Sequence, residues 1–257
     1  MLQAPTAIPA FNDNYIWAIR EGDQCVIVDP GDAAPVEAWL SEQGLTLSAL
    51  LITHHHPDHV GGVAALCRDR DIPVYGPARE TIPEMDHPLG DGDRVRLATP
   101  DLELDVMEVP GHTLGHIAFY APRQGWLFCG DTLFAGGCGR LFEGTPEQMH
   151  HSLTRLAGLP EDTQVFCAHE YTLANLRFAA TVSPEDPAVS DRLARVSALR
   201  EQDRITVPST IGEEKRTNPF LRAADPQLRQ ACEARFGEAP ETNVDSFAAL
   251  RRWKDSA

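Results

Sequence analysis

The sequence predicts an α/β layered fold followed by a helical domain, with a boundary near residue 170. In the first third of the 257-residue chain, short apolar β-rich runs alternate with segments of helical periodicity. From residue 93 to residue 170 most runs are β-rich, whereas beyond Tyr171 the apolar spacing is helical and prolines interrupt it. We therefore expect an α/β domain over residues 1–170 and a helical domain over residues 171–257.

Turn and capping residues mark the individual elements. Glu21-Gly22-Asp23 separates two β-rich runs as a hairpin turn does, Gly44 ends the first helix, and Thr145-Pro146 begins a later one. Residues 76–92 have no period and are rich in proline, glycine and charge, which predicts a surface loop. The expected strands are 15–20, 24–28, 47–53, 73–76, 94–97, 102–109, 117–120, 126–129 and 164–168, and the expected helices are 35–43, 60–70, 145–156, 173–181, 187–202, 225–236 and 243–253.

The composition restricts the class of function. A net charge of −16 at pH 7 argues against a nucleic-acid partner, but a local basic cluster could still bind an anionic small molecule. The six cysteines form no CxxC pair and fit reduced packing thiols. The sequence shows no signal peptide and no apolar run of the roughly 18 residues that a membrane span needs. We expect a cytoplasmic monomer without a membrane partner.

The segment Thr53-His54-His55-His56-Pro57-Asp58-His59 carries the strongest chemical signal. It follows an apolar strand and precedes Gly61-Gly62, the position at which α/β proteins place chemistry. In an extended chain His54, His56 and Asp58 face one side, while the neighbouring His59 points elsewhere and could serve a second ion. Imidazole and carboxylate donors suit zinc, iron or manganese better than calcium. A chance histidine cluster or a nonspecific metal patch is the alternative.

Three further candidate ligands stand where other strands end: His112, Asp131 and His169. A first ion could take His54, His56 and His112, and a second could take Asp58, His59 and His169. Asp131 is the expected bridge, because each carboxylate oxygen can bind one ion. Asp29 is either a side chain that orients the histidines from behind or a plain turn residue. We expect His55 to face solvent or to support a ligand from behind, and His116 to form structural hydrogen bonds within its loop; neither is expected to bind metal.

These motifs together resemble the metallo-β-lactamase superfamily: THxHxDH followed by Gly-Gly, the loop Gly111–His116, Gly130-Asp131-Thr132 and the late His169. The resemblance implies an αββα sandwich with a dinuclear site between its sheets, over residues 1–170. Two divalent ions are expected, with zinc first and iron or manganese as alternatives. A hydroxide that bridges the ions would be the nucleophile, and Asp58 and Asp131 would take part in catalysis.

The remaining motifs resemble the glyoxalase II family of hydroxyacylglutathione hydrolases and extend the likeness over almost the whole chain. They are 137–145, 168–172, Asn218–Arg222 and 251–254. The resemblance implies hydrolysis of S-D-lactoylglutathione to glutathione and D-lactate, the second step of methylglyoxal detoxification. It also implies that Arg140, Tyr171, Arg251 and Lys254 bind the glutathione part. Some members carry Lys and Tyr at the positions of Arg140 and Phe142, and phenylalanine cannot donate a tyrosine's hydrogen bond.

Other functions within the superfamily compete with this one. A lactonase, a β-lactamase or a ribonuclease would use the same ligands, although the charge disfavours a nuclease and the missing signal peptide disfavours a β-lactamase. A persulfide dioxygenase with one iron would need oxygen and lacks the helical tail. A protein that binds metal without catalysis is opposed by the complete set of seven ligands.

Overall fold

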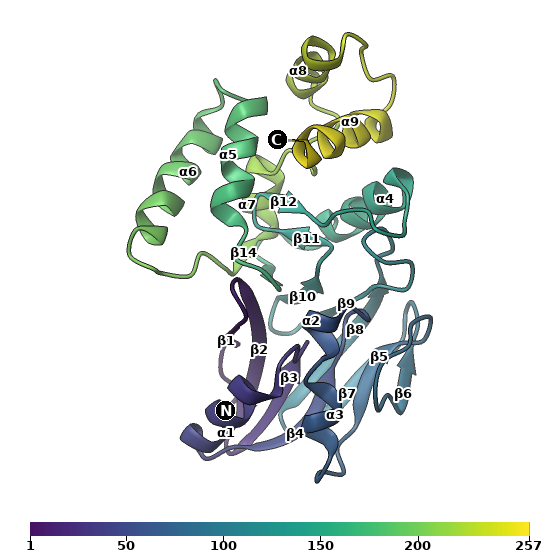
Figure 1. Ribbon diagram of the computed structural model, residues 1–257, viewed down its shortest axis with the longest axis vertical. Coiled ribbons are helices and arrows are strands. Elements are labelled where there is room, and N and C mark those ends of the chain that lie inside the picture. Colours follow the sequence, from purple (N-terminus) through teal and green to yellow (C-terminus); the bar gives the residue numbers. More distant parts are fainter. Residues whose placement is uncertain (257) are drawn as a thin grey trace. The chain divides into compact units, whose positions relative to one another are not determined.

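The computed structural model describes residues 1–256, which form two compact units (Figure 1). Unit 1 comprises Met1–Glu108 and Leu114–Gly130, and unit 2 comprises Val109–Thr113 and residues 131–256. This division by compactness follows different limits from the expected domains, so the domain boundary near residue 170 stays a prediction. Over the described residues, no helix combines the length and the apolar character that crossing a membrane requires.

The first sheet of unit 1 has the strand order β1-β2-β3-β4-β5-β6. Its first three strands are antiparallel, and β3 to β6 run parallel, with helices in the connections from β3 to β4 and from β4 to β5 and a loop in the connection from β5 to β6. The strands are β1 (Thr6–Ala10), β2 (Asn14–Glu21), β3 (Gln24–Val28), β4 (Thr46–Leu51), β5 (Val74–Pro77) and β6 (His87–Leu89). The predicted hairpin is confirmed, because Glu21 pairs with Gln24 across the turn.

Three helices follow strands of this sheet: α1 (Ala33–Gln43), α2 (Pro57–Val60) and α3 (Val63–Cys67). Val36 of α1 and Leu66 of α3 are fully buried in one apolar core with Ile27 and Leu50 of the sheet. Asp32 begins α1 because its side chain accepts a hydrogen bond from the amide of Ala34. The helices therefore cover one face of the sheet.

The expected helix over 60–70 is shorter than predicted and is divided at Gly61-Gly62. The backbone at Gly62 approaches the loop after β3 so closely that a Cβ there would lie 2.6 Å from the carbonyl oxygen of Pro30. This approach requires glycine. Residues 76–92 also differ from the prediction, since they contain β6 and the buried side chain of Ile82.

The second group of strands in unit 1 is an antiparallel meander in the order β10-β9-β8-β7. Its strands are β7 (Arg94–Ala98), β8 (Asp101–Glu108), β9 (Ile117–Ala121) and β10 (Trp126–Gly130), close to the predicted ranges. Along β8 the apolar residues are buried and the acidic residues between them are less so. Phe119 pairs with Val106 and with Phe128, and all three are buried. This alternation explains why the sequence pattern identified these strands.

Unit 2 contains two short strand pairs and six helices (Figure 1). The pairs are β11 (Leu133–Phe134) with β12 (Gly137–Cys138), and β13 (Gln164–Cys167) with β14 (Ser209–Thr210). The helices are α4 (Pro146–Ala157), α5 (Thr172–Val182), α6 (Pro187–Arg200), α7 (Ile211–Thr217), α8 (Pro226–Phe236) and α9 (Asn243–Asp255). The helix predicted to start at Thr145 is confirmed, with a full capping box between Thr145 and Gln148. Helix α7 was not predicted.

An aromatic core holds the helices of unit 2 together. The Phe220 ring lies 6.0 Å from that of Phe178 on α5 and 5.8 Å from that of Phe247 on α9. Trp253 of α9 meets Phe178 edge to face at 6.1 Å and also contacts Phe236 of α8. These contacts fix α9, whose last two turns carry Arg251 and Lys254, against the rest of the unit.

Candidate active site

The histidine run of unit 1 changes from extended to helical backbone at its middle. His56 has φ −62° and ψ 145° and is the N-cap of α2, which contains Asp58 and His59. The prediction that the chain stays extended through Asp58 is therefore wrong. Pro57 occupies the first helical position, where its fixed φ favours a turn.

The helical turn brings the histidine rings together. The centroid of the His54 ring lies 4.0 Å from that of His59 and 4.7 Å from that of His56. His54 and His59 are 0% and 1% exposed. The helical turn also keeps His59 beside Asp58, with its Nε2 3.6 Å from Oδ2 of Asp58, so these two residues can serve one ion as expected from the sequence.

Asp29 fixes the protonation pattern of two of these histidines. It is buried, and its carboxylate accepts hydrogen bonds from the Thr53 amide at 2.8 Å and the Thr53 hydroxyl at 2.7 Å. It also accepts from Nδ1 of His59 at 3.0 Å. Because the Thr53 hydroxyl donates to Asp29, its oxygen accepts from Nδ1 of His54 at 3.1 Å. Each Nδ1 then carries the proton, and each Nε2 presents the lone pair that a metal needs.

Two further contacts in unit 1 support the run. The His116 ring is fully buried and stacks on the His54 ring at 4.5 Å. Asn14, at the start of β2, donates its side-chain amide to Oδ2 of Asp58 at 2.9 Å. That bond orients the Asp58 carboxylate, a contact that could not be read from residues 44 positions apart in sequence.

The other three candidate ligands lie together in unit 2. Nε2 of His112 is 3.4 Å from Oδ2 of Asp131, and Nε2 of His169 is 3.3 Å from Oδ1 of the same carboxylate. All three side chains are at least nine-tenths buried. Nδ1 of His112 donates to the carbonyl oxygen of Arg140 at 2.8 Å, which again directs the Nε2 lone pair toward Asp131. Asp131 thus has one oxygen toward each histidine, the geometry expected of a bridging carboxylate.

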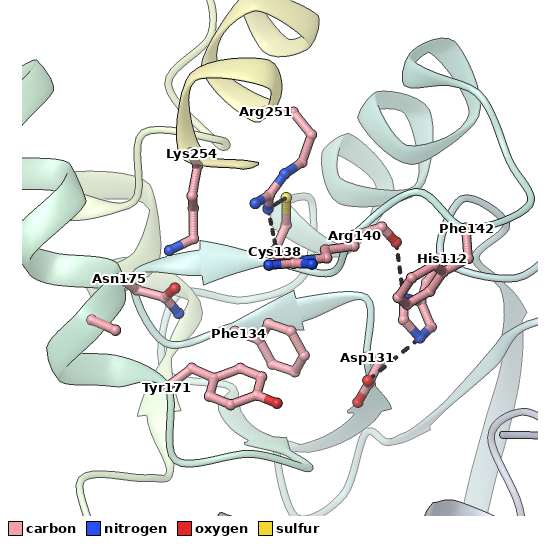
Figure 2. A pocket seen from close by; sticks show the side chains of 11 residues that line it. His112, Asp131, Phe134, Cys138, Arg140, Phe142, Tyr171, Asn175, Arg251 and Lys254 are labelled. Atoms are coloured by element: carbon pink, nitrogen blue, oxygen red, sulfur yellow. Dashed lines mark hydrogen bonds and ion pairs between the residues drawn. The ribbon is translucent and has the colours of Figure 1, made fainter. Parts of the chain in front are cut away.

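A cavity of about 530 Å³ opens next to this cluster, within unit 2 (Figure 2). His112 and Asp131 form part of its wall, so candidate metal ligands and the cavity share one surface. Figure 2 shows the side chains of Arg251 and Lys254, which come from α9, on the other side of the cavity. The full lining is His112, Asp131, Phe134, Cys138, Arg140, Phe142, Tyr171, Ala174, Asn175, Arg251 and Lys254.

Three cations line the cavity, each in a different setting. Arg251 is 4% exposed and lies over the Phe220 ring, and its guanidinium donates to the Cys138 carbonyl at 2.9 Å and to Asp255 at 2.8 Å. Arg140 is 68% exposed in its side chain, with Nε 3.8 Å from Asp255. Arg251 is therefore a fixed part of the wall, whereas Arg140 is free to move toward a ligand.

Lys254 is the cation whose charge depends on pH. Its Nζ lies 5.5 Å from the centre of the Phe178 ring. Burial, reinforced by the positive charge of Arg251, lowers the pKa of Lys254 to about 8. A negatively charged ligand would favour the protonated form.

Two aromatic residues flank the candidate ligands. The Tyr171 ring stacks parallel on the His169 ring at 4.7 Å and meets Phe134 edge to face at 5.3 Å. Phe142 is 63% exposed, and its ring meets the His112 ring edge to face at 5.2 Å. All four substrate-binding residues predicted from the sequence line the cavity, together with Phe142.

Sequence reasoning missed the residues that hold one wall of the cavity. Three buried side chains form hydrogen bonds with the backbone of the turn between β11 and β12. Asn175 donates to the carbonyl of Ala135, and Asn218 donates to the carbonyls of Phe134 and Gly137. Glu214 accepts from the amide of Gly136. Glu214 is fully buried, and Arg192 Nη2 donates to it at 2.6 Å. Asn218 belongs to the motif Asn218–Arg222 that was singled out from the sequence, but nothing in the local sequence indicated its partner.

Comparisons with known proteins agree along the whole chain. The family profile of the metallo-beta-lactamase superfamily matches residues 11–169, and the profile of the hydroxyacylglutathione hydrolase C-terminus matches residues 170–257. The chain is 56% identical over 254 residues to the hydroxyacylglutathione hydrolase of Pseudomonas entomophila (strain L48). It is 55% identical over 253 residues to that of Pseudomonas aeruginosa (strain LESB58). Both alignments cover 97% of this chain and 97% of the relative.

A solved structure supports the fold independently. The crystal structure of TTHA1623 in a di-iron-bound form is similar with a TM-score of 0.60 and 30% identity. The match covers 85% of this chain and 100% of that chain. The predicted metallo-β-lactamase fold with a C-terminal helical region is therefore confirmed.

Proposed function

The chain belongs to the hydroxyacylglutathione hydrolase family of the metallo-β-lactamase superfamily, and we propose how its residues carry out that thioester hydrolysis. The enzyme cleaves hydroxyacylglutathione thioesters, and we take S-D-lactoylglutathione, the intermediate of methylglyoxal detoxification, as its natural substrate. One observation carries this mechanism: the cavity that holds three cations also has His112 and Asp131 in its wall. A glutathione thioester needs both a cationic pocket and a site that activates its carbonyl.

The proposed metal ligands are the seven residues expected from the sequence: His54, His56, Asp58, His59, His112, Asp131 and His169. Five imidazoles and two carboxylates suit divalent zinc, iron or manganese. The residues fit such ions, because the Nδ1 atoms of His54, His59 and His112 have oxygen partners that direct their Nε2 lone pairs outward. We propose two ions per chain, with zinc first. When bound, they supply Lewis acidity and lower the pKa of water toward neutrality.

The chain's own residues orient the reacting groups. Asp131, with one oxygen toward His112 and one toward His169, would span the two ions. Asp58, held by Asn14, would ligate and also accept a hydrogen bond from the nucleophilic water. The departing glutathione thiolate has a pKa near that of cysteine, ~8.5, so a strong general acid is unnecessary at this step.

Arg140, Lys254, Tyr171 and Arg251 are the proposed substrate-binding residues. The free carboxylates of glutathione would meet Arg140, the most exposed of the cations, and Lys254, whose charge would be favoured by the anion. Arg251 already donates to Cys138 and Asp255, so it would contribute charge and hold the wall in place. Phe142, at the rim, offers an apolar surface where a tyrosine would offer a hydroxyl.

The test is hydrolysis of S-D-lactoylglutathione by purified protein, with metal counted on the same sample. We expect release of glutathione and D-lactate, about two ions per chain, and loss of both on chelation with recovery on adding zinc. Asp131→Ala serves as the control that removes the proposed bridge without touching the cations. A fully metallated protein that leaves this thioester intact would contradict the substrate, and one ion per active chain would contradict the dinuclear site.

We also propose that the enzyme is cytoplasmic and acts as a monomer. None of the six cysteines, all of which the structure describes, forms a disulfide, which suits a reducing compartment. The residues that line the substrate cavity all belong to unit 2 of this chain. Light scattering of the active protein tests the oligomeric state.

A further inference from the structure

The loop between β5 and β6 contains a buried carboxylate that accepts hydrogen bonds from two other segments of unit 1. The side chain of Glu80 is 4% exposed, although the sequence predicted a surface loop here. Its Oε2 accepts from the backbone amide of His55 at 2.6 Å and from Nδ1 of His55 at 2.9 Å. Its Oε1 accepts from the backbone amide of Gly115 at 3.1 Å. Both oxygens are therefore occupied by groups from two distant segments of unit 1.

These two segments meet at the ring of His54. His55 lies between the proposed ligands His54 and His56, so fixing its amide and its ring fixes the backbone that carries both. Gly115 precedes His116, whose ring stacks on His54 at 4.5 Å with an interplanar angle of 18°. Glu80 thus joins the backbone beneath the ligands to the segment that supports the His54 ring.

Gly115 provides independent support for the importance of this contact. Its φ is not in the left-handed region, so its backbone does not require glycine. A Cβ at this position would overlap Cγ of Glu80 and lie 3.0 Å from its Oε1. The close approach of the Glu80 side chain is therefore the steric reason why the position needs a residue without a side chain.

We propose that Glu80 is a positioning residue of the metal centre, which holds His54 and His56 in the geometry that binds metal. This inference rests on the metal-dependent function proposed above. A carboxylate is suited to the role because both of its oxygens accept, whereas a glutamine side chain has one acceptor and one donor. Loss of a residue that orients metal ligands from behind typically weakens metal binding about 10- to 100-fold.

The experiment measures zinc affinity by competition with a chelating indicator for the wild type, Glu80→Gln and Glu80→Ala. We expect Glu80→Ala to weaken binding of the tighter ion about 10- to 100-fold. Glu80→Gln should fall between it and the wild type. The matched control is Glu84→Gln, on the exposed part of the same loop, which should bind zinc as the wild type does. With zinc-loaded variants, kcat for S-D-lactoylglutathione should fall while KM stays unchanged, because the proposed glutathione pocket lies in unit 2.

A second set of variants separates positioning from general loss of stability. Gly115→Ala should weaken zinc binding in the wild-type background, where its methyl group meets Glu80. In the Glu80→Ala background it should add much less, because Cγ and Oε1 of Glu80 are gone and only the 3.1 Å contact with Cβ of Arg79 remains. Equal zinc affinity of the wild type and both Glu80 variants would overturn the inference, as would additive effects in the double variant. If the wild type binds zinc but leaves the thioester intact, the proposed substrate fails while these affinities still decide the role of Glu80.

Discussion

Asp29→Asn is the sharpest test of how the fold prepares the histidines for metal. Asp29 has a φ of 53°, a conformation that asparagine tolerates as well as aspartate, so the substitution leaves the backbone unstrained. What changes is the pattern of donors and acceptors. Asp29 accepts from the Thr53 amide on Oδ1, and from the Thr53 hydroxyl and His59 Nδ1 on Oδ2.

Neither orientation of an asparagine amide satisfies all three donors. With its nitrogen at the Oδ2 position, it would face the proton on His59 Nδ1 and favour the other tautomer, whose Nε2 carries hydrogen. With its nitrogen at the Oδ1 position, it would face the Thr53 amide proton. A mismatched buried donor costs about 1–3 kcal/mol. We therefore expect zinc binding to weaken by roughly 10- to 100-fold, which is about 1.4–2.8 kcal/mol.

The assay is zinc competition at neutral pH, together with kcat for the thioester at saturating zinc. Asp32→Asn is the matched control. Asp32 lies three residues after Asp29 and is the N-cap of α1, and asparagine caps a helix equally well. It should match the wild type in both measurements. Wild-type zinc affinity and kcat in Asp29→Asn would refute the argument that Asp29 sets the histidine tautomers.

Three further outcomes are expected. Asp131→Ala should lose bound metal and activity together, as measured by metal analysis and thioester hydrolysis, and an active metallated variant would contradict the bridging role. Because burial lowers the pKa of Lys254 to about 8, its charge is present below that pH and lost above it. The wild-type KM should therefore rise as the pH passes about 8. Lys254→Ala should raise KM with little change in kcat, and its KM should no longer depend on pH in this range. An unchanged KM in Lys254→Ala would refute the role of Lys254 in substrate binding. Asn218→Ala should lower the free energy of unfolding by about 1–3 kcal/mol, because it removes the buried amide that donates to the carbonyls of Phe134 and Gly137. Denaturant titration checks this against Asn243→Ala on the exposed end of α9.

The parts of the fold that the sequence predicted are those in which local chemistry and burial agree. In strand β8, buried apolar residues alternate with less buried acidic residues. Thr145 begins α4 with a capping box that can be recognised from the four residues Thr145–Gln148. Helix α7 was missed because its segment Ile211–Thr217 is mostly charged. Its Glu214 is buried only because Arg192 and the turn at Gly136 supply partners from elsewhere in the chain.

The candidate site divides in the same way. Residue type and spacing identified the ligands, since imidazoles and carboxylates at strand ends have few other uses. The path of the backbone was predicted less well. Pro57 is a residue that favours the start of a helix, so the sequence did contain a signal for the helical turn at Asp58 and His59. The expectation of an extended strand end outweighed that signal. The contacts of Asn14 with Asp58 and of Glu80 with His55 could not be predicted, because these pairs are 44 and 25 residues apart in the sequence.

The cationic cavity shows how an acidic chain can bind an anionic substrate. The net charge of −16 is spread over the whole chain, whereas Arg140, Arg251 and Lys254 line one cavity, where the local field matters more than the total. Asp255 moderates that field, because it lies 2.8 Å from Arg251 and 3.8 Å from Arg140. The short bond to the buried Arg251 holds the wall together, while the longer, exposed contact with Arg140 is weak enough for a substrate carboxylate to replace it. One carboxylate can therefore stabilise the cavity before binding and give up the exposed cation when the substrate arrives.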